Sequence, residues 1–359
     1  YDNCDMLTNG WGVCSIDGSD EGVRMYIKNS RLELTGPRAH GYGTFCIGDN
    51  EIIWENSTVD VNGYPMLVMG MMGKGHAAIL DSKVRGRRFG AMVVSDDNSV
   101  FDIKGSDFKT GNSSIVVKGS ATTINIENTR FEPGNGVVLQ LMDSDEGGMD
   151  MAEFIVPIGE EDVYTEGRDL TAVTEEDVIV NIADCTIKGN MFNSTSNIRP
   201  TDRCPHGGMG KFHDTVIGHL SFPAPEPGAE LPPPRHGGDD LKGAKNLGLT
   251  LKNTKIEGQI SAAKQAYREG VTVIREDNRL ELTNITQWAA PTVNNGIVLS
   301  LDKDCVWTVT GESYLTELRL EDGAVIQAPE GKTLSVTLDG AALTLAAGDY
   351  KGKIALSVC

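Results

Sequence analysis

Acidic residues recur in this chain directly after a series of short apolar segments, and paired carboxylates are groups that can do chemistry. Four such groups are Asp17, Asp20 and Glu21, then Asp49 and Glu51, then Asp96 and Asp97, then Asp143, Asp145 and Glu146. Two carboxylates at a suitable separation serve as the catalytic pair in glycoside hydrolysis. Carboxylates also bind Ca²⁺, and Asp is common in turns for local reasons alone. These three interpretations stay open.

Basic and amide side chains accompany the acids. Lys118 and Gln140 end two consecutive apolar segments, and we expect them to be stacked neighbours about 4.8 Å apart. Arg85 and Arg88 lie just before another such segment, which starts at Phe89. A base beside a carboxylate row can remove the proton next to a uronate carboxylate, and arginine pairs with acidic sugars. Ion pairs between neighbouring segments explain the same residues without a substrate.

These observations define the expected site. The expected catalytic residues are Asp143, Asp145, Glu146, Lys118 and Arg88. The expected substrate-binding residues are Gln140, Asp96, Asp97, Arg85, Trp11, Tyr42 and Tyr64. Calcium is a candidate ion at the acidic loop edge, and no other cofactor is indicated. A weaker metal candidate consists of Cys204, His206, His213 and His219, whose spacing matches no standard zinc pattern.

The elements that must position these side chains come from a repeated motif. An apolar residue, a spacer, Asn, Asp or Gly, a small residue, a spacer and a second apolar residue occur together eight times. The third position falls at Asn3, Asn29, Asn56, Asp81, Gly105, Asn128, Asp184 and Asn253. The first five steps are 26, 27, 25, 24 and 23 residues, a period typical of stacked repeat units.

Alternation of apolar and polar residues with period two, as in 54–61, indicates strands. Second strands are expected at 12–16, 43–47, 66–69, 90–94, 114–118 and 136–140. The leucine pattern of leucine-rich repeats is absent, and propeller blades need about 40 residues or more. We therefore expect an all-β protein, a right-handed parallel β-helix (a solenoid) with about 23–27 residues per coil. The Asn, Asp and small residues of the motif should stack into an internal ladder.

Two long loop insertions interrupt the repeat, at about 149–176 and about 199–244. The second contains Pro232, Pro233 and Pro234, which cannot join a central sheet. We expect the β-helix to cover 1–293 and smaller β coils over 294–359 to cap it. The chain opens at Tyr1 inside a repeat, so we expect that a leader or further coils have been removed.

The second strands are apolar on both faces, although a solvated face would be polar. The row expected to be buried is Cys14, Phe45, Leu67, Met92, Val116 and Val138. The residues on either side of it are also apolar, so we expect something to cover this sheet. The two insertions are the favoured cover, and another subunit or a ligand are the alternatives.

The charge and the hydropathy of the chain argue against several classes of binding partner. A formal net charge of −19 argues against nucleic acid and anionic membranes, and no stretch of about 18 apolar residues predicts a membrane span. The seven cysteines leave at least one without an intrachain partner. Cys4 and Cys185 occupy the small-residue position of the motif, where burial as small side chains is expected. The candidate disulfides are Cys14–Cys46 and Cys305–Cys359.

The segments 10–13, 114–119, 136–140 and 307–311 resemble the pectate-lyase-like superfamily of right-handed β-helices, and the chain looks closest to uncharacterised secreted bacterial β-helix-repeat proteins. The resemblance covers nearly the whole chain and implies a secreted or cell-surface protein that acts on extracellular polysaccharides. The Asn-Thr-Asp, Asp-Asp, Gly-His-Gly and Arg-Ile-Lys set of polygalacturonases is absent, so no catalytic residue is carried over.

Three functional hypotheses follow. The first is a carbohydrate-active enzyme, a glycoside hydrolase or a polysaccharide lyase that uses outer-face carboxylates and a basic residue. The second is a surface or adhesion module that forms a homo-oligomer through its apolar outer sheet. The third is a carbohydrate-binding solenoid without catalysis. The enzyme is favoured, and a polysaccharide or oligosaccharide is the expected partner.

Overall fold

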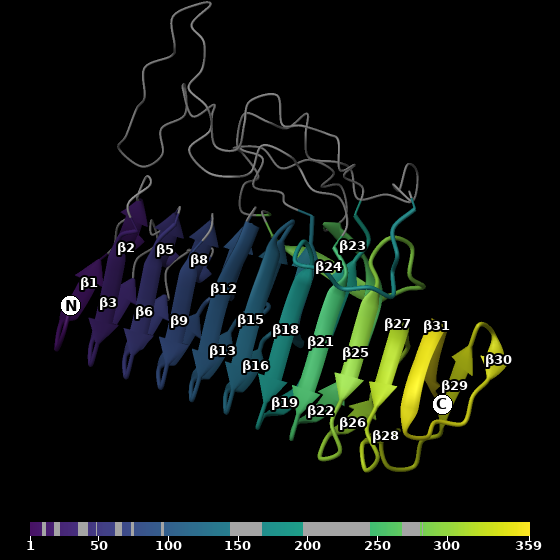
Figure 1. Cartoon of the computed structure of the whole chain (residues 1–359). Helices are drawn as coiled ribbons and strands as arrows, with labels where there is room; N and C mark the ends of the chain where they lie inside the picture. Colours follow the sequence, from purple (N-terminus) through teal and green to yellow (C-terminus); the bar gives the residue numbers. More distant parts are fainter. Residues whose placement is uncertain are drawn as a thin grey trace, which may run out of the picture.

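The protein is built from β-strands that lie side by side in long sheets (Figure 1). The computed structural model describes residues 1–8, 12–17, 22–34, 42–47, 49–61, 67–72, 75–94, 97–143, 167–196, 245–267, 281 and 283–359. These residues form 31 strands and no α-helix. None of them forms a helix long and apolar enough to cross a membrane.

The longest sheet, sheet A, faces the viewer in Figure 1. Its strands, in spatial order, are β3 (Arg24–Lys28), β6 (Glu51–Glu55), β9 (His76–Leu80), β12 (Asp97–Lys104), β15 (Ala121–Glu127), β18 (Val178–Ala183), β21 (Leu247–Lys252), β25 (Ile297–Leu301), β27 (Ser313–Leu320), β31 (Gly348–Val358), β29 (Leu334–Leu338) and β30 (Ala341–Ala342).

Three further sheets complete the described fold. Sheet B contains β1 (Asp5–Thr8), β4 (Arg31–Leu34), β7 (Thr58–Val61), β10 (Lys83–Gly86), β13 (Asp107–Thr110) and β16 (Arg130–Pro133). Sheet C contains β2 (Gly12–Asp17), β5 (Tyr42–Ile47), β8 (Leu67–Met72), β11 (Phe89–Val94), β14 (Ile115–Lys118), β17 (Val137–Met142), β20 (Asn190–Ser194), β23 (Ile260–Tyr267) and β24 (Ile285–Ala289). Sheet D contains β19 (Thr186–Lys188), β22 (Lys255–Gly258), β26 (Val306–Val309) and β28 (Val325–Gln327).

The chain visits the sheets in a fixed order. Strands β1, β2 and β3 belong to sheets B, C and A, and each later set of three up to β21 repeats this order, with sheet D in the place of sheet B at β19. Within each sheet, strands of successive units therefore pair in parallel over this part of the chain, as β6 does with β3. The expected second strands are confirmed as β2, β5, β8, β11, β14 and β17 of sheet C.

The corner from sheet A to sheets B and D has the same length from β3 to β22. Two residues join the strands in seven successive units, from Asn29 and Ser30 to Asn253 and Thr254. The first residue has a positive φ, for example 47° at Asn56 and 54° at Asp184. Asn and Asp tolerate this left-handed conformation better than other side chains, and Gly105 takes it at φ 59°. The corner from sheet C to sheet A varies, and the long intervals 143–177 and 195–246 both fall there.

The second corner residue builds a buried ladder. The amide of Ser30 donates to the hydroxyl of Ser57 at 3.1 Å, and the amide of Ser57 donates to Ser82 at 3.0 Å. Thr and Cys continue the ladder, since the amide of Thr129 donates to Sγ of Cys185 at 3.4 Å. The expected internal ladder is confirmed for the small residues. It is wrong for the Asn and Asp residues, which are exposed and bond to one another outside, as Asn56 does to Asn29 at 2.8 Å.

The core fills the space between the sheets. Ile27, Trp54 and Ile79 of sheet A face Leu32, Val59 and Val84 of sheet B, and all of them are buried. The rings of Phe108 and Phe131 lie 5.3 Å apart on adjacent strands of sheet B. Cys185 and Cys305 are buried free thiols, and Cys4 and Cys359 are also free, so the Cys305–Cys359 disulfide is not formed.

The prediction of the inner face of sheet C is wrong for β11 and β14 but correct for Val138 of β17, which lies in the main core. Ala91, Val93, Ile115 and Val117 belong to the main core. Met92 and Val116, which were expected to be buried there, lie in a second cluster on the other side of the sheet, and Phe45 packs against that cluster. Period-two alternation does not identify the inner face when both faces are apolar.

The C-terminal region continues the stack only in part. Strands β25 to β28 extend sheets A and D in parallel, as the expected smaller coils would. Strand β31 then pairs antiparallel with β27 and with β29, so the last strands are not coils.

The ladder predicts the effect of one substitution on stability. Ser82 is 2% exposed, accepts from Ser57 and donates to the carbonyl of Leu80. Ser82→Ala leaves the amide of Ser57 buried without that acceptor, which should lower the free energy of unfolding by about 1–3 kcal/mol. Chemical denaturation measures this. Ser82→Thr is the matched control, because Thr fills the same position at Thr129 and Thr254, and an equal loss in both variants would contradict the role of the hydroxyl.

Candidate functional site

Much of the expected site lies outside the described residues. This holds for Asp145, Glu146, Asp96, Trp11 and Tyr64, for the side chain of Asp97, and for Cys204, His206, His213 and His219. The described members are Lys118, Gln140, Asp143, Arg85, Arg88 and Tyr42. Among the described residues, no group of three or more His, Cys, Asp or Glu side chains is arranged to hold a metal ion.

Lys118 and Gln140 do not stack as expected. The register pairs Lys118 with Met142 and Gln140 with Val116, so the two residues are two positions out of step. Both side chains are buried, at 0% and 1% exposure. Gln140 accepts from Ser113 at 2.6 Å and donates to the carbonyl of Thr283 at 3.1 Å. Neither side chain is accessible to a polysaccharide in this structure.

A hairpin of the chain itself covers this face of sheet C. Strands β23 and β24 pair antiparallel, and Tyr267 and Ile285 from them pack on Met92, Val116 and Met142. Gln287 of β24 donates to the carbonyl of Leu141 at 3.0 Å. A cover was expected, but the segment that provides it among the described residues was not one of the two expected insertions.

The cover predicts the reactivity of one lysine. Lys118 should resist acylation by an amine-reactive reagent in the native protein, whereas the exposed Lys109 and Lys188 should be modified. Peptide mass spectrometry after brief labelling measures this. The denatured protein is the control, since Lys118 should react there. Equal labelling of Lys118 and Lys188 in the native protein would contradict the burial.

The remaining described candidates lie in separate places. Arg85 on sheet B is bound to Asp107 at 2.5 Å, and Arg88 lies over the ring of Phe89 at 5.2 Å. The ring of Tyr42 packs against Phe45 at 5.2 Å. Asp143 follows β17 and lines a cavity of about 20 Å³, room for one water molecule, with Ser194, Ser196 and Lys245. The structure does not bring these residues together.

A continuous polar row instead crosses the outer face of sheet A. The row consists of Tyr26, Glu51, His76, Asp102, Asn125 and Asn181, one from each of six consecutive strands, β3 to β18. The hydroxyl of Tyr26 donates to Glu51 at 2.7 Å. Asn125 donates to Asp102 at 2.8 Å, and Asn181 donates to Asn125 at 2.9 Å. Each strand of the stack therefore adds one hydrogen-bonding side chain to the row.

His76 joins two carboxylates at the centre of the polar row. Its Nδ1 lies 3.0 Å from Oε1 of Glu51, and its Nε2 lies 2.9 Å from Oδ2 of Asp102. An ionised carboxylate only accepts hydrogen bonds, so both ring nitrogens must donate, which requires the imidazolium form. Burial lowers the pKa of His76, but the hydrogen bonds to Glu51 and Asp102 outweigh it and raise the pKa above 6.5. The bond from Tyr26, followed by that from His76, lowers the pKa of Glu51.

A shallow hollow of about 370 Å³ adjoins the C-terminal half of the polar row. Asp102, Asn125 and Asn181 line it together with Thr250, Lys104 and Lys252. Ion pairs across the strands flank the row, with Lys28–Glu55 at 2.7 Å and Lys104–Glu127 at 2.9 Å. The hollow thus combines carboxylate, amide, hydroxyl and ammonium groups on one rigid sheet.

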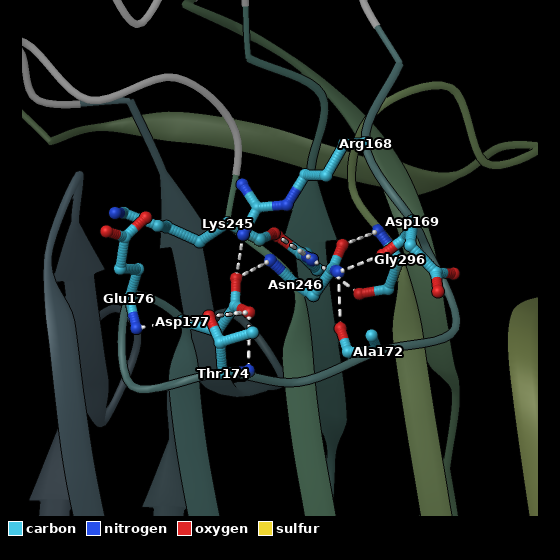
Figure 2. A network of polar contacts seen from close by, with 10 residues as sticks. Arg168, Asp169, Ala172, Thr174, Glu176, Asp177, Lys245, Asn246 and Gly296 are labelled. Atoms are coloured by element: carbon cyan, nitrogen blue, oxygen red, sulfur yellow. Dashed lines mark hydrogen bonds and ion pairs between the residues drawn. The ribbon is translucent and has the colours of Figure 1, made fainter.

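A second polar network fixes a segment beside this face (Figure 2). Asp177, which is buried, binds Arg168, accepts from the amide of Thr174 at 2.9 Å, and accepts from the amide of Asn246 at 2.8 Å. The side chain of Asn246 donates to the carbonyls of Asp169 and Ala172. These bonds hold 167–177 at the amino ends of β18, β21 and β25.

The anchored segment bounds the outer face of sheet A at β21. A Cβ atom on Gly248 would lie 2.9 Å from the side chain of Val173, so a larger residue at this outward position would displace Val173. The segment belongs partly to the expected acidic insertion, yet residues 167–176 pack back onto the sheet. The network is a structural anchor rather than a ligand site, because all three bonds of Asp177 named above are to protein groups.

The sequence analysis does not predict the polar row, although Glu51 is among its acidic residues. Tyr26, Asp102, Asn125 and Asn181 are the polar positions between the apolar residues of the sheet A strands. The alternation that identified the strands also marks these positions as outward. Glu51 and His76 occupy a different register position, since Tyr26 pairs with Ile53 and Asp102 pairs with Ala78, so alignment between units finds only four of the six members.

No protein-family model, no curated protein and no solved structure matches this chain. Function therefore has to be argued from the described geometry.

The His76 cluster predicts a pH dependence of stability. Because folding raises the pKa of His76, its contribution is full below the ordinary value of 6.5 and is lost as pH rises through the raised pKa. Because folding lowers the pKa of Glu51, its contribution is full above 4.5 and is lost as pH falls through the lowered pKa. The Tm of the unchanged protein should therefore exceed that of His76→Gln by the largest amount between pH 4.5 and pH 6.5. A difference that does not change from pH 5 to pH 9 would contradict the cluster.

Proposed function

We propose that this chain is a right-handed parallel β-helix, similar in architecture to the pectate-lyase-like superfamily, that binds a polysaccharide along the outer face of sheet A. The parallel pairing of every third strand supports the β-helix. The observation that carries the function is the polar row from Tyr26 to Asn181 with the hollow beside it. The proposal places the protein outside the cell, where such ligands occur.

The shape of the polar row suits an extended chain of sugars. Its side chains repeat at the spacing of parallel strands, about 4.8 Å, along the long axis of the stack. A polysaccharide that lies across the strands meets a new hydrogen-bonding group at each one. Tyr26, at the N-terminal end of the row, is 40% exposed and offers a ring for stacking on a sugar. Because these side chains already bond to one another, they are ordered before the ligand binds.

A second candidate function is hydrolysis of the bound polysaccharide. Glu51 and Asp102 lie at opposite ends of one imidazole ring, at 3.0 and 2.9 Å from its nitrogens. This holds two carboxylates at a separation of the order used by inverting glycosidases, roughly 6.5–9.5 Å. Catalysis requires that His76 move and that water take its place. Elimination by Lys118 is not favoured, because that side chain is buried.

A homo-oligomer formed through the apolar face of sheet C is also not favoured. The hairpin of β23 and β24 occupies the described part of that face, from β11 to β20.

Substitutions in the polar row test the proposed binding. Asn125→Ala removes the bonds to Asp102 and from Asn181, and should weaken polysaccharide binding by about tenfold, the loss expected for one or two net hydrogen bonds. Thr186→Ala, at an exposed position of sheet D, is the control and should bind as the unchanged protein does. A panel of plant, algal and microbial polysaccharides in affinity gel electrophoresis identifies the ligand.

The same panel separates binding from catalysis. New reducing ends that disappear in Glu51→Gln and Asp102→Asn would show hydrolysis, and absorbance at about 235 nm would show elimination. Binding without either product makes the protein a binding module. Full binding by Asn125→Ala would remove the polar row from consideration.

A further inference from the structure

We propose that the ligand of the polar row is an uncharged glycan and that the row discriminates against polyanionic glycans such as uronate polymers. This inference rests on the proposed polysaccharide binding and adds the class of sugar. Its basis is the hydrogen-bonding character and pairing of the charged side chains on the outer face of sheet A.

The carboxylates of the row can bind only donors. The side chains of Glu51 and Asp102 are 21% and 37% exposed, so their outer surfaces reach solvent. Ionised carboxylates accept hydrogen bonds and have none to donate. Sugar hydroxyls can satisfy them, whereas a uronate carboxylate or a sulfate would bring a second acceptor with a like charge.

Three cations beside the row already have carboxylate partners, whereas Lys252, which lines the hollow, makes no ion pair within the described part of the chain. Arg24 lies 3.4 Å from Glu51, Lys28 lies 2.7 Å from Glu55, and Lys104 lies 2.9 Å from Glu127. An anionic ligand that recruits one of them has to break an ion pair and leave a carboxylate behind. Tight recognition of carboxylates or sulfates in proteins uses charge-assisted contacts, with Arg forks as the strongest.

The hollow carries no net charge to attract an anion. Its charged lining residues are Asp102, Glu127, Lys104 and Lys252, two negative and two positive. The chain as a whole has a formal charge of −19, so the long-range field repels polyanions at low ionic strength. Asn125, Asn181 and Thr250 supply the remaining polar lining, and these neutral groups match hydroxyls as donors and acceptors.

The experiment compares ligands that differ in charge. Binding of neutral galactomannan, β-glucan and dextran is measured by affinity electrophoresis and calorimetry beside polygalacturonate and alginate, at about 20 and 500 mM salt. We expect at least one neutral polysaccharide to bind, with a Kd at least about tenfold below that of either polyanion at both salt concentrations. Tighter binding of a polyanion overturns the inference and leaves the proposed binding function intact. Absence of binding to every polysaccharide overturns both.

A variant that should gain binding of a polyanion provides a second test. Thr250→Lys places an additional ammonium group in the hollow and should create binding of polygalacturonate that weakens with salt. Thr186→Lys changes the net charge equally but lies on sheet D, so it should gain nothing. Equal gains in the two variants would show that net charge, rather than the hollow, governs the response, and would overturn the inference. The thermal unfolding of both variants checks that they are folded.

Discussion

Parallel pairing between successive units is the constraint on which the rest of this structure depends. Because β3, β6, β9 and their successors pair in register, each outward residue lies beside its equivalent in the next unit. One residue type repeated along the sequence becomes one continuous row in space. The buried hydroxyl ladder and the exposed Asn and Asp ladder follow from it, and so do four of the six members of the polar row. Each arises because the same type of residue recurs at one position of successive units.

The same constraint explains how charge is arranged on the outside. Residues of opposite charge at equivalent positions of neighbouring strands pair across the sheet, as Lys104 and Glu127 do. Such exposed pairs contribute little stability individually. Their effect on function is larger, because a cation that is paired on the surface is not available to an acidic ligand. His76 differs, since it contacts carboxylates on both sides and links three strands.

The sequence was sufficient to predict the strands and their stacking, because a period of 23–27 residues with two-residue corners leaves few alternatives. It was not sufficient to distinguish the faces of sheet C. Met92 and Val116 are as apolar as Ala91 and Val93, and only the hairpin of β23 and β24 makes both faces dry. The misplacement of Lys118 and Gln140 has a related cause: the start of β17 was set two residues out of register. The polar row could be predicted only in part, because Glu51 and His76 lie two residues before the register position of its other four members.

The two kinds of corner differ in how well they tolerate a change in length. At the corner after sheet A, Asn29, Asn56 and their equivalents fix the backbone, and one added residue would move the strand that follows by one position and turn its core side chains outward. At the corner after sheet C, the intervals 143–177 and 195–246 separate consecutive strands, and β18 and β21 still pair in register with the strands before them. Length errors therefore do not accumulate along the molecule. The corner after sheet C can therefore be lengthened while the corner after sheet A stays at two residues. New surfaces can be added in this way without disturbing the existing rows.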